Sequence, residues 1–174
     1  MKLNYEKHIL ELLNIAIDSG REILKIYDNE IIINSKEDKS PITQADINSN
    51  NLIVNRLKKL EPNIPILSEE SLVSWESRKD WNTYWLIDPL DGTKEFINRN
   101  GEFTVNISLI ENNYPIFGII YSPVKSLLYY ALKNNGCYKL KTNSNLSTLK
   151  DFMKININKG KNSTTKVIGS RSHV

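Results

Sequence analysis

Cysteine is almost absent from this 174-residue sequence, and Cys137 is its only example. One thiol cannot form an internal disulfide framework, nor can it supply a cluster of thiolate ligands for a metal. Basic tracts are also missing, and 23 Lys and Arg against 20 Asp and Glu leave a formal net charge of only +3. So mild a charge argues against nucleic acid as a partner.

Long apolar runs are missing as well. No window of the sequence approaches the length of apolar chain that crosses a bilayer. The first twenty residues alternate charged with apolar side chains, unlike the continuous apolar stretch of a secretory signal peptide. We therefore expect no integral membrane segment and a cytoplasmic protein, with peripheral attachment at the inner membrane kept open as an alternative.

Apolar residues recur at helical spacing in two segments of the N-terminal third. Residues 3–28 have the pattern of an amphipathic helix. A second helix is predicted from Thr43, a good N-cap residue, to the helix-ending sequence "EPNIP". Between the two helices, "IIINS" predicts a strand and "KEDKSP" predicts a charged loop closed by Pro41.

Short strand-like segments follow the second helix. They are "PILSEE", "YWLID", "FTVNISLI", "PIFGIIYSPV", "LLYYAL" and "CYKLK", separated by turn sequences such as "ENNYP" and "KNNG". This order predicts an α+β fold, a two-layer sandwich with two long helices on one side of a mostly antiparallel sheet. Further along, "NSNLSTLKD" predicts a linker and "KVIGSRSHV" predicts the start of another strand.

The stretch "WLIDPLDGTKEFI" places Asp88 and Asp91 where a predicted buried strand ends. Pro89 restricts the backbone between them, and Gly92 permits a close approach that a side chain would block. A helix that begins at "GTKEF" would point its free backbone N–H groups at whatever lies above the two aspartates. Such a helix start suits an anion, particularly phosphate.

Further carboxylates lie at comparable positions. Glu69 and Glu70 end the strand "PILSEE", and Asp46 lies near the start of the second helix. Carboxylates beside an anion would repel it unless a cation bridged them, and oxygen ligands of this kind suit Mg²⁺. Brought together, they would form a metal-assisted phosphoryl-transfer site. Taken singly, "DG" is usually a turn and "EE" is usually solvated surface, so the hypothesis depends on their combination.

Several motifs then occur together in one order: "SPITQAD", "PILSEES", "YWLIDPLDGTKEFINRNGEFTVNISLI" and "PIFGIIYSPV". The set resembles the signature of the inositol monophosphatase superfamily, whose members are lithium-sensitive, magnesium-dependent phosphomonoesterases. In that signature, an acidic "EE" strand end is followed by "DPxDGT". The resemblance is strongest to the 3'(2'),5'-bisphosphate nucleotidases of the bacterial CysQ type. The glutamate in "DGTKEF" favours this branch, since inositol monophosphatases more often have asparagine there.

The resemblance implies Mg²⁺ as cofactor and a set of ligands for it. Glu69, Asp88 and the backbone carbonyl of Leu90 resemble the ligands of a first metal ion. Asp88 would bridge to a second ion that it shares with Asp91. The sugar-phosphatase-like fold that the resemblance implies agrees with the two-layer sandwich expected from the order of elements.

The resemblance also implies the catalytic groups. Thr93 resembles the hydroxyl that orients a nucleophilic water, with Asp46 behind it as proton acceptor, and Glu70 resembles a carboxylate that positions water. Gly92 and Thr93 would donate backbone N–H bonds to the scissile phosphate. The residues expected to contact the substrate are Glu69, Leu90, Asp91, Gly92 and Thr93.

The small-molecule substrate implied by the resemblance is adenosine 3',5'-bisphosphate, hydrolysed to AMP and phosphate by direct attack of water. Two alternatives stay open. One is an inositol or sugar monophosphatase of the same superfamily, and the other is a non-catalytic, metal-binding remnant of the nucleotidase.

Members of the resembled family continue past the "SRSH" strand into a segment with a "WDxAAG"-like motif. We therefore expect residues 1–160 to form the N-terminal metal-binding phosphatase domain, and residues 161–174 to begin a truncated C-terminal α/β domain. The strand expected at residues 166–170 would then have no sheet to join. Hydrolysis would be impaired, and a complementing C-terminal fragment or a homo-oligomer is the expected protein partner.

Overall fold

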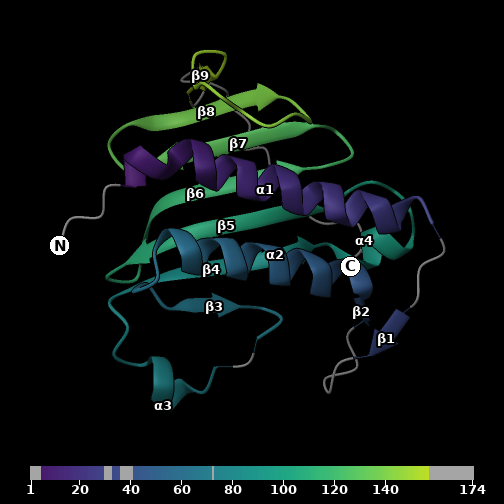
Figure 1. Cartoon of the computed structure of the whole chain (residues 1–174), viewed down its shortest axis with the longest axis horizontal. Coiled ribbons are helices and arrows are strands. Elements are labelled where there is room, and N and C mark those ends of the chain that lie inside the picture. The colour runs from purple at the N-terminus through teal and green to yellow at the C-terminus, as the bar shows by residue number, and fades with distance from the viewer. Residues whose placement is uncertain (1–4, 30–32, 36–40, 72, 157–174) are drawn as a thin grey trace, which may run out of the picture.

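The computed structural model describes residues 5–29, 33–35, 41–71 and 73–156. Two long helices, α1 (Tyr5–Tyr27) and α2 (Gln44–Leu60), lie side by side over one face of a seven-stranded sheet (Figure 1). This is the two-layer α+β sandwich that the order of apolar patterns predicts, with both helices close to their expected bounds. Among the described helices, none combines the length and apolar character that a bilayer crossing requires.

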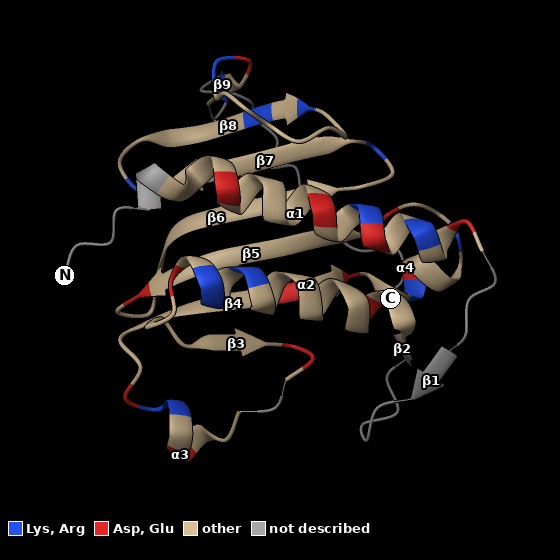
Figure 2. Cartoon of the chain, viewed as in Figure 1, with Lys and Arg blue, Asp and Glu red and all other residues tan. Residues whose placement is uncertain are grey.

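Apolar side chains at helical spacing hold the two layers together. Leu13 and Ile17 of α1 and Ile53 and Leu57 of α2 are fully buried between the helices and the sheet. Burial of each such side chain contributes about 1.5–3 kcal/mol to folding, so this layer is the main source of stability. Acidic and basic residues follow one another along α1, whereas the charged residues near the end of α2 are basic (Figure 2).

The sheet has the strand order β3-β4-β5-β6-β7-β8-β9. Its strands are β3 (Ile66–Ser68), β4 (Thr83–Asp91), β5 (Thr104–Glu111), β6 (Tyr114–Ser122), β7 (Leu127–Leu132), β8 (Gly136–Lys141) and β9 (Met153–Ile155). From β4 onward, each strand pairs antiparallel with the next, which confirms the predicted meander. Among the described strands, only β3 and β4 run parallel, so their carboxyl ends lie at the same edge.

Short elements complete the described chain. Helix α3 (Trp75–Arg78) lies between β3 and β4, and helix α4 (Thr93–Ile97) follows β4 directly. Tyr27 at the end of α1 packs against Phe96 and Phe103, with ring centroids 5.3 and 5.0 Å away. This aromatic cluster anchors α4 beneath the end of β4.

Two features of local structure were not predicted. Pro41 begins strand β2 (Pro41–Thr43), which pairs with β1 (Ile33–Ser35), the strand expected at "IIINS"; a proline is tolerated as the first residue of a strand. The predicted linker near residue 146 packs Leu146 and Leu149 against the core and leads into β9, which pairs with β8. The expected strand at 166–170 and the domain boundary at 160 lie outside the described residues, so both stay predictions.

Candidate active site

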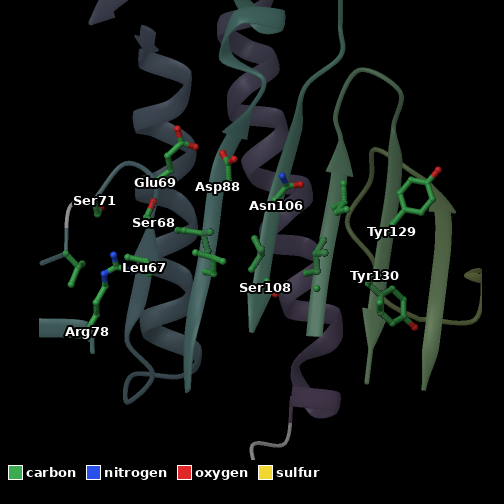
Figure 3. Close-up of a pocket in the computed structure, with 18 of the residues that line it drawn as sticks. Leu67, Ser68, Glu69, Ser71, Arg78, Asp88, Asn106, Ser108, Tyr129 and Tyr130 are labelled. Carbon is green, nitrogen blue, oxygen red and sulfur yellow. The ribbon is translucent and has the colours of Figure 1, made fainter. Parts of the chain in front are cut away.

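The parallel pair β3 and β4 brings two acidic side chains together. Ser68 is the register partner of Ile87, so the next residues, Glu69 and Asp88, are neighbours across the strands. The backbone N–H of Glu69 donates to the carbonyl of Ile87 at 3.2 Å, which continues the pairing to this point. Figure 3 shows both carboxyl groups side by side at the strand ends.

Asp88 is in an electrostatically unfavourable position for a carboxylate. Burial, followed by the negative charges of Glu69 and Asp91, raises the pKa of Asp88 from 3.8 to about 8. A side-chain hydrogen bond with Glu69 acts in the same direction, and a hydrogen bond with the Leu90 backbone opposes it. Its Oδ1 atom is buried and has no hydrogen-bond partner among the described residues. With this raised pKa, the Asp88 carboxyl keeps its proton at neutral pH unless a positive charge is bound nearby.

Strand β4 was expected to end at Asp88, but it continues to Asp91. The register against β5 shifts between these two residues, which is the signature of a bulge. Pro89, which has no N–H to offer a neighbouring strand, lies inside this bulge. Strand β4 therefore carries both aspartates, and its bulge allows Asp88 and Asp91 to lie at the same end of the sheet.

Two buried serines hold the bulge from behind. Ser49 Oγ donates to the carbonyl of Pro89 at 2.7 Å, and Ser19 Oγ lies 2.6 Å from Ser49 Oγ. Both serines are fully buried, one on α2 and one on α1. A chain of hydroxyl groups therefore connects both helices to the backbone between the two aspartates. Nothing in the sequence singles out these serines, because isolated serines in a helix have no distinctive pattern.

Asp91 is positioned by the adjacent strand. Asn106 of β5 donates from Nδ2 to Asp91 Oδ2 at 3.0 Å, and Thr104 Oγ1 donates to Asn106 Oδ1 at 3.1 Å. Asn106 is also the register partner of Asp88. Sequence reasoning missed Asn106, which lies among the polar residues of the alternating strand segment "FTVNISLI".

Asp46 and Thr93 meet, as the resemblance implied. Thr93 Oγ1 donates to Asp46 Oδ1 at 3.1 Å, although the two residues are 47 positions apart. Asp46 is fully buried, and its Oδ2 atom accepts from the backbone N–H of Thr43 at 2.7 Å and from Thr43 Oγ1 at 2.6 Å. The bond from the Thr43 N–H belongs to the capping box of α2, with Thr43 as the predicted N-cap. Asp46 is therefore rigidly oriented.

The turn into α4 requires glycine. Gly92 has φ +96°, a left-handed conformation that a residue with a side chain rarely adopts. A Cβ atom there would lie 3.1 Å from the carbonyl oxygen of Glu102. The Phe96 N–H donates to the Gly92 carbonyl, so α4 begins where the sequence predicted a helix.

Glu70 lies in the turn after β3. Its backbone N–H donates to Ser68 Oγ at 3.2 Å, and Ser68 Oγ in turn donates to Asn50 Oδ1 at 2.7 Å. The turn is thereby connected to α2. Glu70 is half-buried beside Glu69.

The donor atoms at this edge suit a hard divalent cation. They are carboxylate oxygens together with the Leu90 carbonyl, the ligand type that Mg²⁺ prefers. In the described part of the chain, no three His, Cys, Asp or Glu side chains form a ready-made metal-binding group. Glu69 and Asp88 are in direct contact, whereas Asp91 influences Asp88 through its charge while bonded to Asn106. The Oδ1 atom of Asp88, which has no hydrogen-bond partner among the described residues, is therefore available to bind a cation.

The pattern that defines the inositol monophosphatase family matches residues 6–173. The chain belongs to this family. The "3'(2'),5'-bisphosphate nucleotidase CysQ" of Salmonella typhimurium is 49% identical over 123 residues, which are 70% of the chain and 50% of that protein. The protein of the same name from Haemophilus influenzae is 42% identical, covering 79% and 52%. The chain spans about half the length of the curated relatives it matches.

Solved structures of the family share the fold. The CysQ structure from Bacteroides thetaiotaomicron has a TM-score of 0.65 at 44% identity, covering 76% of this chain and 49% of that one. The suhB protein of Bartonella henselae has a TM-score of 0.67 at 27% identity, covering 75% and 51%. Both agree with the mixed seven-stranded sheet and its helices.

Proposed function

We propose that this inositol monophosphatase family chain carries the metal-binding part of a Mg²⁺-dependent phosphomonoesterase. Its substrate is adenosine 3',5'-bisphosphate, hydrolysed to AMP and phosphate. The observation that carries the proposal is the contact of Glu69 with Asp88 at one sheet edge, close to a hydrogen-bonded Thr93–Asp46 pair. The relatives named as bisphosphate nucleotidases, at up to 49% identity, support this substrate over inositol phosphates.

In this proposal, Glu69, Asp88, Asp91 and the Leu90 carbonyl hold Mg²⁺. When bound, the ion supplies positive charge for the phosphate oxygens and lowers the pKa of a water molecule. Asp88 would then give up its proton, because a carboxylate must be ionised to act as a ligand. Asn106 keeps Asp91 turned towards the edge through its 3.0 Å hydrogen bond.

Thr93 and Asp46 provide the route for the proton of the attacking water. Thr93 has a single O–H, which is 3.1 Å from Asp46 Oδ1 and 3.4 Å from the Leu90 carbonyl. The shorter bond, to a charged acceptor, is the stronger one. The Thr93 oxygen keeps its lone pairs for the water, so it accepts the water proton while its own proton moves to Asp46.

Glu70 and Gly92 complete the arrangement. Glu70, in the turn directly after Glu69, would help to position the attacking water. Gly92 leaves the backbone N–H groups at the start of α4 uncovered by a Cβ, so they can donate to the phosphate. The departing 3'-oxygen takes a proton from solvent water.

A pair of substitutions tests the proposal. Phosphate release from adenosine 3',5'-bisphosphate and from inositol 1-phosphate is measured with Mg²⁺, for the wild type, Thr93→Val and Asp88→Asn. Each assay is repeated with the unmatched half of the Salmonella typhimurium nucleotidase supplied as a second chain. Thr93→Val keeps the shape of the side chain but removes the hydroxyl, so kcat is expected to fall about 10²–10⁴-fold. Mg²⁺ binding, measured by calorimetry, should persist in Thr93→Val and be lost in Asp88→Asn.

Thr83→Val, at the opposite end of β4, is the matched control and should keep full activity. Preferential turnover of inositol 1-phosphate would instead identify a sugar monophosphatase. Retained Mg²⁺ binding without turnover of either ester, with the second chain present, would identify a non-catalytic remnant.

A further inference from the structure

The sequence contains two Asn-Gly pairs, and neither takes part in the proposed hydrolysis. One is Asn100–Gly101, between α4 and β5, and the other is Asn135–Gly136, where the turn after β7 enters β8. An asparagine followed by glycine is chemically reactive, because no side chain shields the glycine nitrogen from the asparagine amide carbon. The surroundings of each pair then decide how fast it reacts.

The reaction at such a pair needs only the protein and water. The Gly136 nitrogen gives its proton to solvent and attacks Cγ of Asn135, and a C–N bond forms. The side-chain amide takes up a proton and leaves as ammonia, so a cyclic succinimide remains. Water then opens the ring at either of its carbonyl carbons. Attack at Cγ gives aspartate, and attack at the backbone carbon gives isoaspartate, in which the main chain runs through Cγ.

A phenol is aimed at the oxygen on which negative charge develops. Tyr138 Oη donates to Asn135 Oδ1 at 2.6 Å, whereas its contact with the Asn135 backbone carbonyl is longer, at 3.2 Å. When the nitrogen adds to Cγ, Oδ1 becomes an oxyanion, and a donor that is already in place stabilises it. The Tyr138 ring is held in position because it stacks on the Tyr130 ring, with the centroids 4.9 Å apart.

A cation lies beside the attacking residue. Lys154 of β9 is the register partner of Tyr138, and its Nζ atom lies over the Tyr138 ring, 5.6 Å from the centroid. A Cβ atom on Gly136 would lie 3.3 Å from the same Nζ atom. A positive charge next to the glycine favours the anion that forms when the glycine nitrogen loses its proton. Asn135 and Gly136 are both exposed, so water and hydroxide reach them.

The other pair has different surroundings. Gly101 is buried, and a Cβ atom there would lie 3.1 Å from the apolar side chain of Val124. An amide proton that solvent does not reach is lost slowly. Asn100 Oδ1 accepts from the backbone N–H of Glu102 at 2.9 Å, which closes a local turn. The structure therefore favours reaction at Asn135 over Asn100.

We propose that Asn135 is a modification site, at which the folded chain converts its own asparagine to aspartate and isoaspartate. The strands alternate in direction from β4 to β8, so this turn lies at the opposite end of the sheet from Asp88. Each conversion adds a negative charge near Lys154. Isoaspartate also lengthens the main chain next to the pairing of Leu132 with Gly136. Older molecules are thereby marked in the β7–β8 turn, while the proposed metal ligands are unchanged.

Peptide mapping by mass spectrometry, during incubation of the whole chain at pH 8, follows both pairs in the same molecules. Conversion at Asn135 should be about tenfold or more faster than at Asn100, with aspartate and isoaspartate peptides both present. In urea the two rates should become nearly equal, because unfolding removes the surroundings but leaves each Asn-Gly pair. Equal rates at the two pairs in the folded chain would overturn the proposal.

Two variants test the surroundings directly. Tyr138→Phe keeps the stacked ring and removes the donor, so conversion at Asn135 should slow about tenfold while that at Asn100 is unchanged. Lys154→Gln should slow conversion at Asn135 several-fold. Tyr114→Phe, at a tyrosine that is 70% exposed, is the matched control and should change neither rate. Thermal unfolding verifies that each variant keeps its fold. Unchanged or faster conversion at Asn135 in Tyr138→Phe would also contradict the proposal.

Discussion

Asp88 combines two demands that conflict in the absence of a cation. Its position at the end of a buried strand segment gives it a fixed direction, and the same position removes water that would solvate its charge. Glu69 and Asp91 add like charge. Groups with such perturbed pKa values are common at functional sites, because the arrangement favours a ligand over the empty state.

The pH dependence of stability should report this conflict. Asp88 ionises near pH 3.8 in the unfolded chain, but its pKa in the folded protein is about 8. Between these values the folded state binds a proton that the unfolded state does not, so the free energy of unfolding falls as the pH rises. Asp88→Asn should flatten this decline and make the protein more stable than the wild type at pH 8. Urea unfolding from pH 4 to pH 8, with a chelator present, measures the effect.

Asp80→Asn is the control, because Asp80 is an exposed aspartate that precedes β4 in the sequence. It should leave the pH dependence of unfolding unchanged. An Asp88→Asn protein whose stability declines with pH as steeply as that of the wild type would contradict the assignment of the raised pKa to Asp88.

Ser49 is the second residue whose role can be isolated. Ser49→Ala removes the donor to the Pro89 carbonyl and the partner of Ser19 at once. Leaving buried polar groups unsatisfied costs about 1–3 kcal/mol, so the free energy of unfolding should fall by this amount. Mg²⁺ affinity should also fall, because the Pro89 carbonyl loses the hydrogen bond that fixes the backbone beside Leu90. Ser147→Ala, at an exposed position, should change neither quantity in urea titration and calorimetry.

At the scale of elements, α1 depends on a close approach to β6. A Cβ atom on Gly20 would lie 2.5 Å from Cε1 of the buried Tyr121 ring. Alanine improves helix propensity by about 1 kcal/mol over glycine, but overpacking a core costs about 1–3 kcal/mol. Gly20→Ala should therefore destabilise the protein. In a double-mutant cycle with Tyr121→Leu, the penalty should largely disappear; an equal penalty in both backgrounds would point to backbone conformation instead.

Much of the element order could be predicted because it is encoded locally. The apolar spacing of α1 and α2 and the turn sequences between β5 and β8 are properties of neighbouring residues. The short strands β1 and β3 were expected from "IIINS" and "PILSEE". Strands β2 and β9 were missed, because their own residues have no strand pattern and their pairing with β1 and β8 defines them. The parallel direction of β3 against β4 is likewise a property of long-range pairing.

The candidate site was predictable to the extent that its residues form a motif. Glu69, Asp88 and the Thr93–Asp46 contact were expected from the resemblance, and the structure brings each pair together. Ser49 and Asn106 were not expected, because they act through a backbone carbonyl and through another side chain. Their roles become visible only when the helices and β5 are placed beside the bulge of β4.

At the scale of the whole molecule, the described residues leave an apolar part of the sheet exposed on the face opposite α1 and α2, where Leu86 and Ile120 are 41% and 51% exposed. The chain should therefore bind the fluorescent dye ANS in its native state, since the dye reports exposed apolar surface. Replacing Leu86 and Ile120 with lysine should reduce the dye signal several-fold without lowering the melting temperature by more than a few degrees. Tyr114→Lys, at the start of β6 and away from Leu86 and Ile120, should leave the signal nearly unchanged. Equal dye binding by all three proteins would place the apolar surface elsewhere.

The short edge strand β3 has a kinetic consequence. It contributes only Ile66–Ser68 to the sheet, pairs with β4 on one side, and is connected to α2 through the Ser68–Asn50 bond. Under the proposed function, an ion that joins Glu69 to Asp88 cross-links this strand to its neighbour. Fraying of β3 then sets the residence time of the ion, and amide hydrogen exchange in β3 should slow when Mg²⁺ is added and quicken again after its removal.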